Sequence, residues 1–223
     1  MKKICIILAA MLLCLAVTAC AEPAENAEAP SLIGVTEGDT YENAMFGIGC
    51  KLEGWTYSTA EEIAQINQVA EDLLGEKAAE MLKQGASLIT MLAKSPNALQ
   101  NVNFQASDAS QLKDLFETYG FAAVIGSSTS VYKQQLEEAG FTDVECSATA
   151  VTVGGQDFPA IYGEYKLQGI PMYYKQFWMV EGDYMASFTI TTALQDSTDD
   201  IVSCFYLLPQ DELQLTQDEQ PAG

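Results

Sequence analysis

Residues 172–191 read MYYKQFWMVEGDYMASFTIT, and this stretch decides the fold. A mostly apolar run from Met172 to Val180 is followed by the tight-turn sequence Glu181-Gly182-Asp183. After the turn, the residues most suited to a core recur at every second position from Tyr184 to Ile190. Alternation with a period of two is typical of a strand with one buried face. Two strands joined by so short a turn pair antiparallel, so the stretch predicts part of an antiparallel sheet.

The same alternation recurs on both sides of this hairpin. Residues 143–150 and 161–168 each alternate, and Gly154-Gly155 turns the chain between them. Apolar or alternating segments also occur earlier in the chain. Further strands are therefore predicted at 46–52, 86–94 and 101–105.

Helical signals lie before, between and after the strands. Ser58 with Glu61 and Thr59 with Glu62 form overlapping capping boxes, and an apolar stripe follows from Ile63 to Leu73. Further helices are predicted at 76–84, 108–119, 130–139 and 199–208. Strands joined by short turns, with helices to cover them, predict an α+β fold: a mainly antiparallel β-sheet covered by helices.

The amino-terminal residues have the layout of a bacterial export signal. Lys2-Lys3 precede an apolar run from Ile4 to Val17, which is too short for an ordinary membrane-spanning helix. Small residues then lead to Cys20 in the sequence Val17-Thr18-Ala19-Cys20, which resembles the lipobox of bacterial lipoproteins. The resemblance implies cleavage before Cys20, acylation of its thiol with chains such as palmitate, and anchoring on the extracytoplasmic face of the cell membrane. The alternative is a plain secretory signal with a chance cysteine.

Composition divides the rest of the chain into a tether, a domain and a tail. Residues 20–38 are rich in alanine, acid and proline, which predicts a flexible tether between the anchor and the domain. The periodic segments fill 39–208, a normal length for a single domain. Residues 209–223 are acidic and predict a flexible tail.

The charge of the chain excludes one class of partner. Ten basic residues, all of them lysine, stand against 31 acidic residues, and the formal net charge is −21. Nucleic-acid binding depends on cations that neutralise phosphates, so no nucleic-acid partner is expected. Anionic lipid surfaces are disfavoured for the same reason.

Few catalytic chemistries fit these residues. The chain has no His and no Arg, which removes Ser-His-Asp and Cys-His catalysis and His-dependent zinc sites. Ser130 and Lys133 match the S-x-x-K pattern of penicillin-binding enzymes, but the S-D-N and K-T-G companions are absent, so helix capping by the serine-rich stretch is favoured. The acidic run 196–200 lacks the spacing of a calcium loop. We expect no enzyme, no metal and no cofactor.

Three cysteines remain beyond the leader and Cys20: Cys50, Cys146 and Cys204. They lie in apolar stretches without a C-x-x-C pair, so we expect buried free thiols. One disulfide with an odd thiol stays open as the alternative for an extracytoplasmic protein.

An aromatic run is the most prominent candidate for a ligand surface. In a strand, Tyr174 and Trp178 face one way, and Tyr173 and Phe177 face the other. One set could form an exposed platform for a sugar, a peptide or a protein partner. Burial of both sets under helices is the favoured alternative, because aromatic residues are usually buried.

The order of the elements resembles a known fold. A strand at residues 46–52 leads through Gly54 to Trp55, and strands and helices follow up to Phe188-Thr189-Ile190-Thr191-Thr192 and a last helix with Cys204-Phe205. This order resembles the PsbP-like α/β/α sandwich of the photosystem II extrinsic subunit and of many bacterial lipoproteins, over residues 40–208. The resemblance implies a non-catalytic domain that works by binding or assembly. The alternatives are a ligand-binding lipoprotein for a glycan or peptide, associated with a transporter, and a serine hydrolase-type enzyme.

Overall fold

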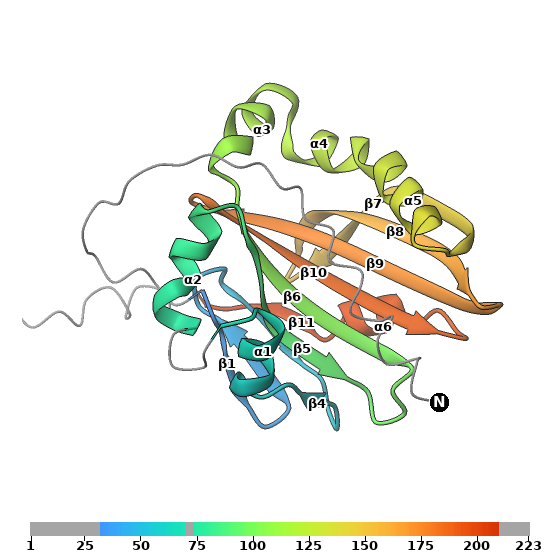
Figure 1. The fold of residues 1–223 in the computed structure, drawn as a ribbon, viewed down its shortest axis with the longest axis horizontal. Coiled ribbons are helices and arrows are strands. Elements are labelled where there is room, and N and C mark those ends of the chain that lie inside the picture. Colours follow the sequence, from blue (N-terminus) through green and yellow to red (C-terminus); the bar gives the residue numbers. More distant parts are fainter. Residues whose placement is uncertain (1–31, 70–73, 210–223) are drawn as a thin grey trace, which may run out of the picture.

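The larger of two sheets forms the frame of the molecule. The computed structural model describes residues 32–69 and 74–209, and within them seven strands pair antiparallel in the order β4-β5-β6-β10-β9-β8-β7 (Figure 1). The strands are β4 (Thr56–Tyr57), β5 (Ser87–Lys94), β6 (Gln100–Asp108), β7 (Thr142–Val153), β8 (Gln156–Leu167), β9 (Ile170–Glu181) and β10 (Tyr184–Ala193). The predicted hairpin is confirmed, because Tyr184 pairs with Glu181 across Gly182, whose φ is 58°.

A smaller sheet covers one face of the larger sheet. Its strands are β1 (Val35–Glu37), β2 (Thr40–Asn43), β3 (Ile48–Lys51) and β11 (Phe205–Leu207), in the order β1-β2-β3-β11. Residues of both sheets form the main core, and Phe104, Phe177, Phe188 and Phe205 lie at its centre. The predicted α+β class with antiparallel sheets is confirmed. The division of the strands between two sheets was not predicted.

Helices cover both faces of the larger sheet. They are α1 (Ala60–Ile66), α2 (Leu74–Lys83), α3 (Lys113–Tyr119), α4 (Phe121–Ser127), α5 (Thr129–Glu138) and α6 (Thr198–Val202), with a 3-10 turn at Ser110–Leu112. In Figure 1, α3, α4 and α5 follow one another along one side of the sheet. Ile125 of α4 and Leu136 of α5 pack there against residues of β7, β8 and β9. Ala78 and Leu82 of α2 belong to the core on the opposite face.

Two predicted helices end earlier than the sequence indicates, and one helix of the structure was not predicted. Residues 199–208 were predicted as one helix, but α6 ends at Val202 and Phe205 begins β11, which pairs with Cys50 of β3. The helix predicted to run on to Leu73 ends at Ile66, because the Asn67 side chain bonds to the backbone of Ile89 in β5. Helix α4 was not predicted at all. In each case a tertiary contact or a glycine overrides the local pattern.

The folded part also begins earlier than predicted. The tether was assigned to 20–38, but Leu32 is buried in the main core and Val35–Glu37 forms β1. The Asn43 amide fixes this segment, because its Nδ2 donates to the Leu32 carbonyl at 3.0 Å. Residues 32–38 therefore belong to the domain.

Candidate functional site

The predicted aromatic platform is mostly core. Tyr174 and Trp178 do share one face of β9, but each is only 3% exposed, under α4 and α5. Phe177 is 0% exposed on the other face, against Phe188. Only Tyr173 is partly exposed. An exposed platform is therefore wrong for Tyr174, Phe177 and Trp178, because helices cover one face of the strand and the smaller sheet covers the other.

The remaining predicted positions are Cys20 and Ser130. Cys20 lies outside the described residues. Within residues 32–69 and 74–209, no helix is long and apolar enough to cross a membrane. Ser130 is exposed on α5, and α5 has no side-chain hydrogen bond at its N-cap, so the predicted capping role is wrong. The nearby Ser127, Ser128 and Thr129 hydroxyls instead donate to carbonyls of α4, at Val124 and Gly126.

The three cysteines of the domain are free thiols in the structure, but only Cys50 is buried as predicted, whereas Cys146 and Cys204 are partly exposed. Burial raises the pKa of Cys50 to about 12, and burial also raises the pKa of Cys146 and of Cys204. Because the thiolate is the reactive form, the raised pKa values keep all three in the unreactive thiol form.

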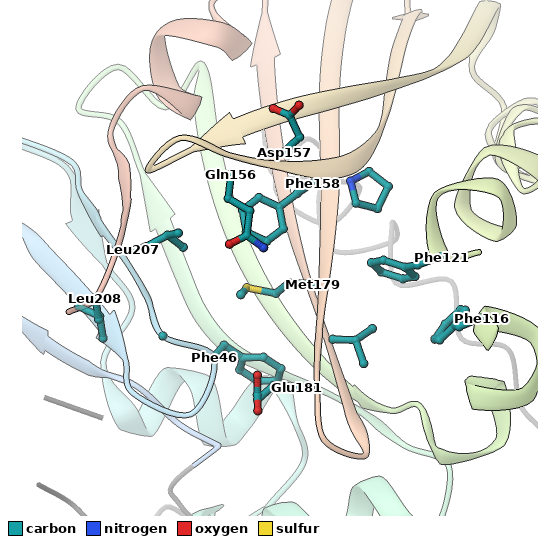
Figure 2. Close-up of a pocket in the computed structure, with 13 residues that line it drawn as sticks. Phe46, Phe116, Phe121, Gln156, Asp157, Phe158, Met179, Glu181, Leu207 and Leu208 are labelled. Carbon is teal, nitrogen blue, oxygen red and sulfur yellow. The ribbon is translucent and has the colours of Figure 1, made fainter. Parts of the chain in front are cut away.

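An apolar groove lies where the two sheets and the helical layer meet. Its volume is about 490 Å³. Figure 2 shows that five separate segments line it: the loop before β3, the α3–α4 corner, the start of β8, the end of β9 and the end of β11 (Figure 2). The groove is therefore assembled by the tertiary fold, since its lining runs from Phe46 to Leu208 in sequence.

A glycine corner places two rings on the groove. Gly120 ends α3 and begins α4 with a φ of 83°, a conformation that glycine adopts without strain. The chain reverses enough there for Phe116 and Phe121 to meet edge to face, with ring centroids 4.9 Å apart. Both rings remain partly exposed and line the groove. They form one wall opposite Phe46 and Leu207.

The polar groups of the groove are acidic or neutral. Asp157 and Glu181 are the charged residues of its lining, and the exposed Gln156 lies beside Asp157 at the start of β8. No lysine lines it. On neighbouring α3, Lys113 forms an ion pair with Asp183 and is therefore engaged outside the groove. A ligand in this groove meets an apolar floor with negative charge at its rim.

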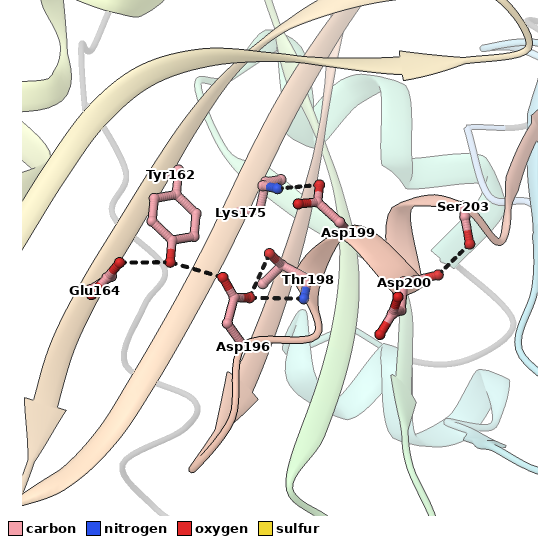
Figure 3. A network of polar contacts seen from close by, with 8 residues as sticks. All are labelled: Tyr162, Glu164, Lys175, Asp196, Thr198, Asp199, Asp200 and Ser203. Carbon is pink, nitrogen blue, oxygen red and sulfur yellow. Dashed lines mark hydrogen bonds and ion pairs between the residues drawn. The ribbon is translucent and has the colours of Figure 1, made fainter.

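A polar network lies at the other end of the larger sheet (Figure 3). The Tyr162 hydroxyl is 2.9 Å from both Glu164 Oε1 and Asp196 Oδ2, and it donates its single proton to one at a time. Asp196 Oδ1 accepts from the Thr198 N–H and hydroxyl. Burial, followed by these two carboxylates, raises the pKa of Tyr162. The phenol therefore stays protonated and serves as a hydrogen-bond donor.

A buried lysine completes this network. The Lys175 side chain is 9% exposed, forms an ion pair with Asp199 of α6, and places Nζ 5.5 Å from the centre of the Tyr162 ring. Among the described residues, no group of three or more His, Cys, Asp or Glu is arranged to hold a metal ion. The network joins α6 to β8 and β9, and we interpret it as structural.

A second cavity, of about 470 Å³, lies beside α6. Four of its polar residues are paired, because Lys51 forms an ion pair with Glu53 and the Gln100 amide donates to the Ser197 hydroxyl at 2.7 Å. The apolar groove, whose aromatic wall is left partly exposed, is therefore the better candidate site.

Comparison with known proteins adds no assignment: neither a known family model nor a curated protein matches this chain. Sequence reasoning missed the groove, although one signal was present. The helix predicted at 108–119 contains Phe116, and Gly120 and Phe121 follow it directly. Two aromatics flanking a glycine at a helix end indicate a corner with a shared apolar surface.

Proposed function

We propose that this chain is a lipid-anchored protein of the extracytoplasmic membrane face that binds an apolar, positively charged segment of a protein partner in its groove. The groove carries the proposal: the partly exposed Phe116 and Phe121 rings face a floor that includes Met179, and the rim bears Asp157 and Glu181. The Cys20 motif supplies the anchor.

Charge selects the kind of partner. The acidic rim and the net charge of −21 repel anionic lipids and acidic peptides and attract a lysine or arginine that flanks an apolar run. A glycan is less suited, because most side chains that line the groove are aromatic or aliphatic and carry no hydrogen-bonding group. Aromatic side chains in a groove are typical anchors for the apolar side chains of a peptide.

A non-catalytic role is part of the proposal. The titratable groups that line the groove are the Asp157 and Glu181 carboxylates, and Asp157 accepts a hydrogen bond from the Thr152 hydroxyl at 2.6 Å. The chain has no histidine to act as a base beside them. Binding through shape, apolar contact and charge requires no further group.

Two labelled peptides test the groove. KLFLFK and its acidic counterpart ELFLFE are titrated against the full chain in detergent, with fluorescence anisotropy as the readout. We expect KLFLFK to bind at least about tenfold more tightly than ELFLFE, a difference of about 1.4 kcal/mol. Phe121→Ala should weaken KLFLFK binding by about tenfold or more, because it removes a groove wall.

Tyr119→Ala is the matched control. Tyr119 is on α3, is 66% exposed and does not line the groove, so this variant should bind KLFLFK like the unchanged protein. Equal weakening by Tyr119→Ala and Phe121→Ala, or equal binding of the two peptides, would contradict the proposal.

The anchor is tested separately. Cys20→Ser removes the thiol that the lipobox resemblance marks for acylation, so the variant should leave the membrane fraction or keep its leader. Mass spectrometry of the unchanged protein should find an acylated Cys20 at the mature amino terminus. A mature chain that begins elsewhere, or a Cys20 without fatty acid, contradicts the anchor and leaves the groove measurement unaffected.

A further inference from the structure

The free edges of the two sheets differ greatly in length. The smaller sheet ends in β1 and β11, which have 3 residues each, and the larger sheet ends on one side in β4, which has 2. The remaining edge strand, β7, has 12 residues. Very short edge strands are one way in which proteins avoid pairing with other chains. Three edges have this protection, and β7 does not.

Within residues 32–69 and 74–209, no strand pairs with the outer edge of β7, and its only partner strand is β8. Helices α4 and α5 pack near one face of β7, through residues such as Ile125 and Leu136. The four residues Ser147–Ala150 are nevertheless all exposed, on both faces of the strand. A strand in which both faces are exposed over four residues leaves its backbone edge accessible to another strand.

The usual chemical protection of an edge is also missing there. Residues 146–156 read CSATAVTVGGQ and include no charged residue and no proline, in a chain whose net charge is −21. A bulge between Thr142 and Glu145, with Asp143 at φ 54°, interrupts only the first residues of β7. Lysines, prolines and bulges are the devices that commonly block edge pairing, and none lies between Cys146 and Val153.

We propose that β7 is a self-association edge, at which a second copy of this chain adds its own β7 antiparallel about a two-fold axis near Thr149. Such a pair joins the two larger sheets into one continuous sheet by main-chain hydrogen bonds. The small side chains of Ser147, Ala148 and Ala150 leave room for the neighbouring strand. The proposal rests on the edge of β7 and does not depend on the groove.

The distribution of charge favours this arrangement. With Thr149 opposite Thr149, the antiparallel register sets Glu145 opposite Val153 and Asp143 opposite Gly155. The acids at the start of each strand therefore meet the uncharged end of the other, whereas a parallel pair would set acids opposite acids. Two chains of this net charge repel each other over most of their surfaces, and the uncharged strip is where the repulsion is smallest.

A cysteine pair tests the arrangement in intact cells. Thr149→Cys is introduced into the full chain, mild oxidant is added, and the mass is read on a non-reducing gel. Directly opposed residues of an antiparallel pair have Cα atoms about 4.5–5.5 Å apart, within the range of a disulfide. We expect a homodimer of twice the chain mass from Thr149→Cys. Neither the unchanged protein nor Thr56→Cys, at the edge strand β4, should give it.

Edge charge provides the second measurement. Thr149→Lys places a lysine on each strand at the two-fold axis, so the full chain in detergent should sediment as a monomer where the unchanged protein sediments as a dimer. Thr56→Lys is the matched control and should stay dimeric. The proposal is overturned if the unchanged protein is monomeric. It is also overturned if folded Thr149→Lys stays dimeric, if larger aggregates form, or if Thr149→Cys cross-links to a different protein.

Discussion

The two faces of the larger sheet are packed by different chemistry. On the face under the smaller sheet, the core is built on phenylalanine: Phe188 stacks on Phe104 at 4.4 Å and on Phe177 at 4.8 Å, and Phe205 meets two of these rings edge to face. On the face under α4 and α5, the large side chains are Tyr165, Tyr174 and Trp178, with a thiol among them. The first core is centred on rings without polar atoms, although it also holds the Tyr41 phenol and the Cys50 thiol, whereas the second is centred on phenols and an indole.

The difference follows from how each face is closed. The phenylalanine core joins strands from both ends of the chain, since β11 pairs with β3 at Phe205 and Cys50. Rings without polar atoms can pack there with no hydrogen bond to satisfy. The second face is closed by helices that precede β7 directly, and its polar atoms find near partners. Tyr174 OH lies 3.4 Å from Cys146 Sγ, and burial raises the pKa of this phenol.

The largest effect should come from the phenylalanine core. Phe188→Ala removes the ring that contacts three others, so it should lower the free energy of unfolding by about 3–5 kcal/mol. Urea unfolding followed by circular dichroism measures the loss. Tyr119→Ala, at an exposed ring, should cost less than about 0.5 kcal/mol. A loss below about 1 kcal/mol for Phe188→Ala would show that the two sheets do not share this core.

On the face under α4 and α5, a larger side chain at Gly163 should destabilise the protein. Gly163 of β8 lies beneath the Tyr174 ring, which a Cβ at this position would strike. Gly163→Ala should therefore destabilise by about 1–3 kcal/mol, since Tyr174 has to move away from Cys146. Gly126→Ala in α4 is the control. Its Cβ would make ordinary contact with Ala148 at 3.5 Å, and the better helix propensity of alanine should stabilise by about 0.5–1 kcal/mol. Chemical denaturation measures the free energy of unfolding of both variants. If both variants raise it, or both lower it, the packing of Tyr174 over Gly163 is contradicted.

The strand pattern shows how much of this architecture the sequence predicts. Alternation located β3, β6, β7, β8 and β10, because half-buried strands place apolar residues at every second position, and apolar runs located β5 and β9. Residues 205–207 were assigned to a helix, because a short apolar run fits either structure. Its strand identity depends on pairing with β3, about 155 residues earlier. The groove was missed for the same reason, since its walls at Phe46, Phe121 and Leu207 meet only in the folded chain.

The ion pair between Lys175 of β9 and Asp199 of α6 joins one buried and one exposed charge. Lys175 is buried, whereas its partner Asp199 is 86% exposed. Asp199→Ala leaves the ammonium buried without its anion and should cost about 1–2 kcal/mol. Lys175→Met leaves a carboxylate that water already solvates, so it should change stability by less than about 0.5 kcal/mol. Urea unfolding of the two variants should show this asymmetry, and equal losses would mean that the pair acts as an exposed one.

The smallest effect concerns the pH response of the same network. Burial alone would raise the pKa of Asp196, but hydrogen bonds from Thr198 and Tyr162 outweigh it and lower the pKa. A carboxyl whose pKa is lowered on folding stabilises the protein above its unfolded pKa, about 3.9, and this stability disappears as the pH falls through the lower folded value. Asp196 is mostly exposed, so its contribution should stay below about 1 kcal/mol after solvent screening.

Asp196→Asn removes this titration. The variant should have a slightly lower free energy of unfolding than the unchanged protein at about pH 6. This difference in free energy should become smaller below about pH 4, because the unchanged protein then also loses its carboxylate charge. Asp200→Asn is the control, because Asp200 enters the hydrogen bonds of Figure 3 only through its backbone carbonyl. Urea midpoints across this pH range decide the matter. If this difference in free energy of unfolding does not change with pH, the charge of Asp196 does not contribute to stability.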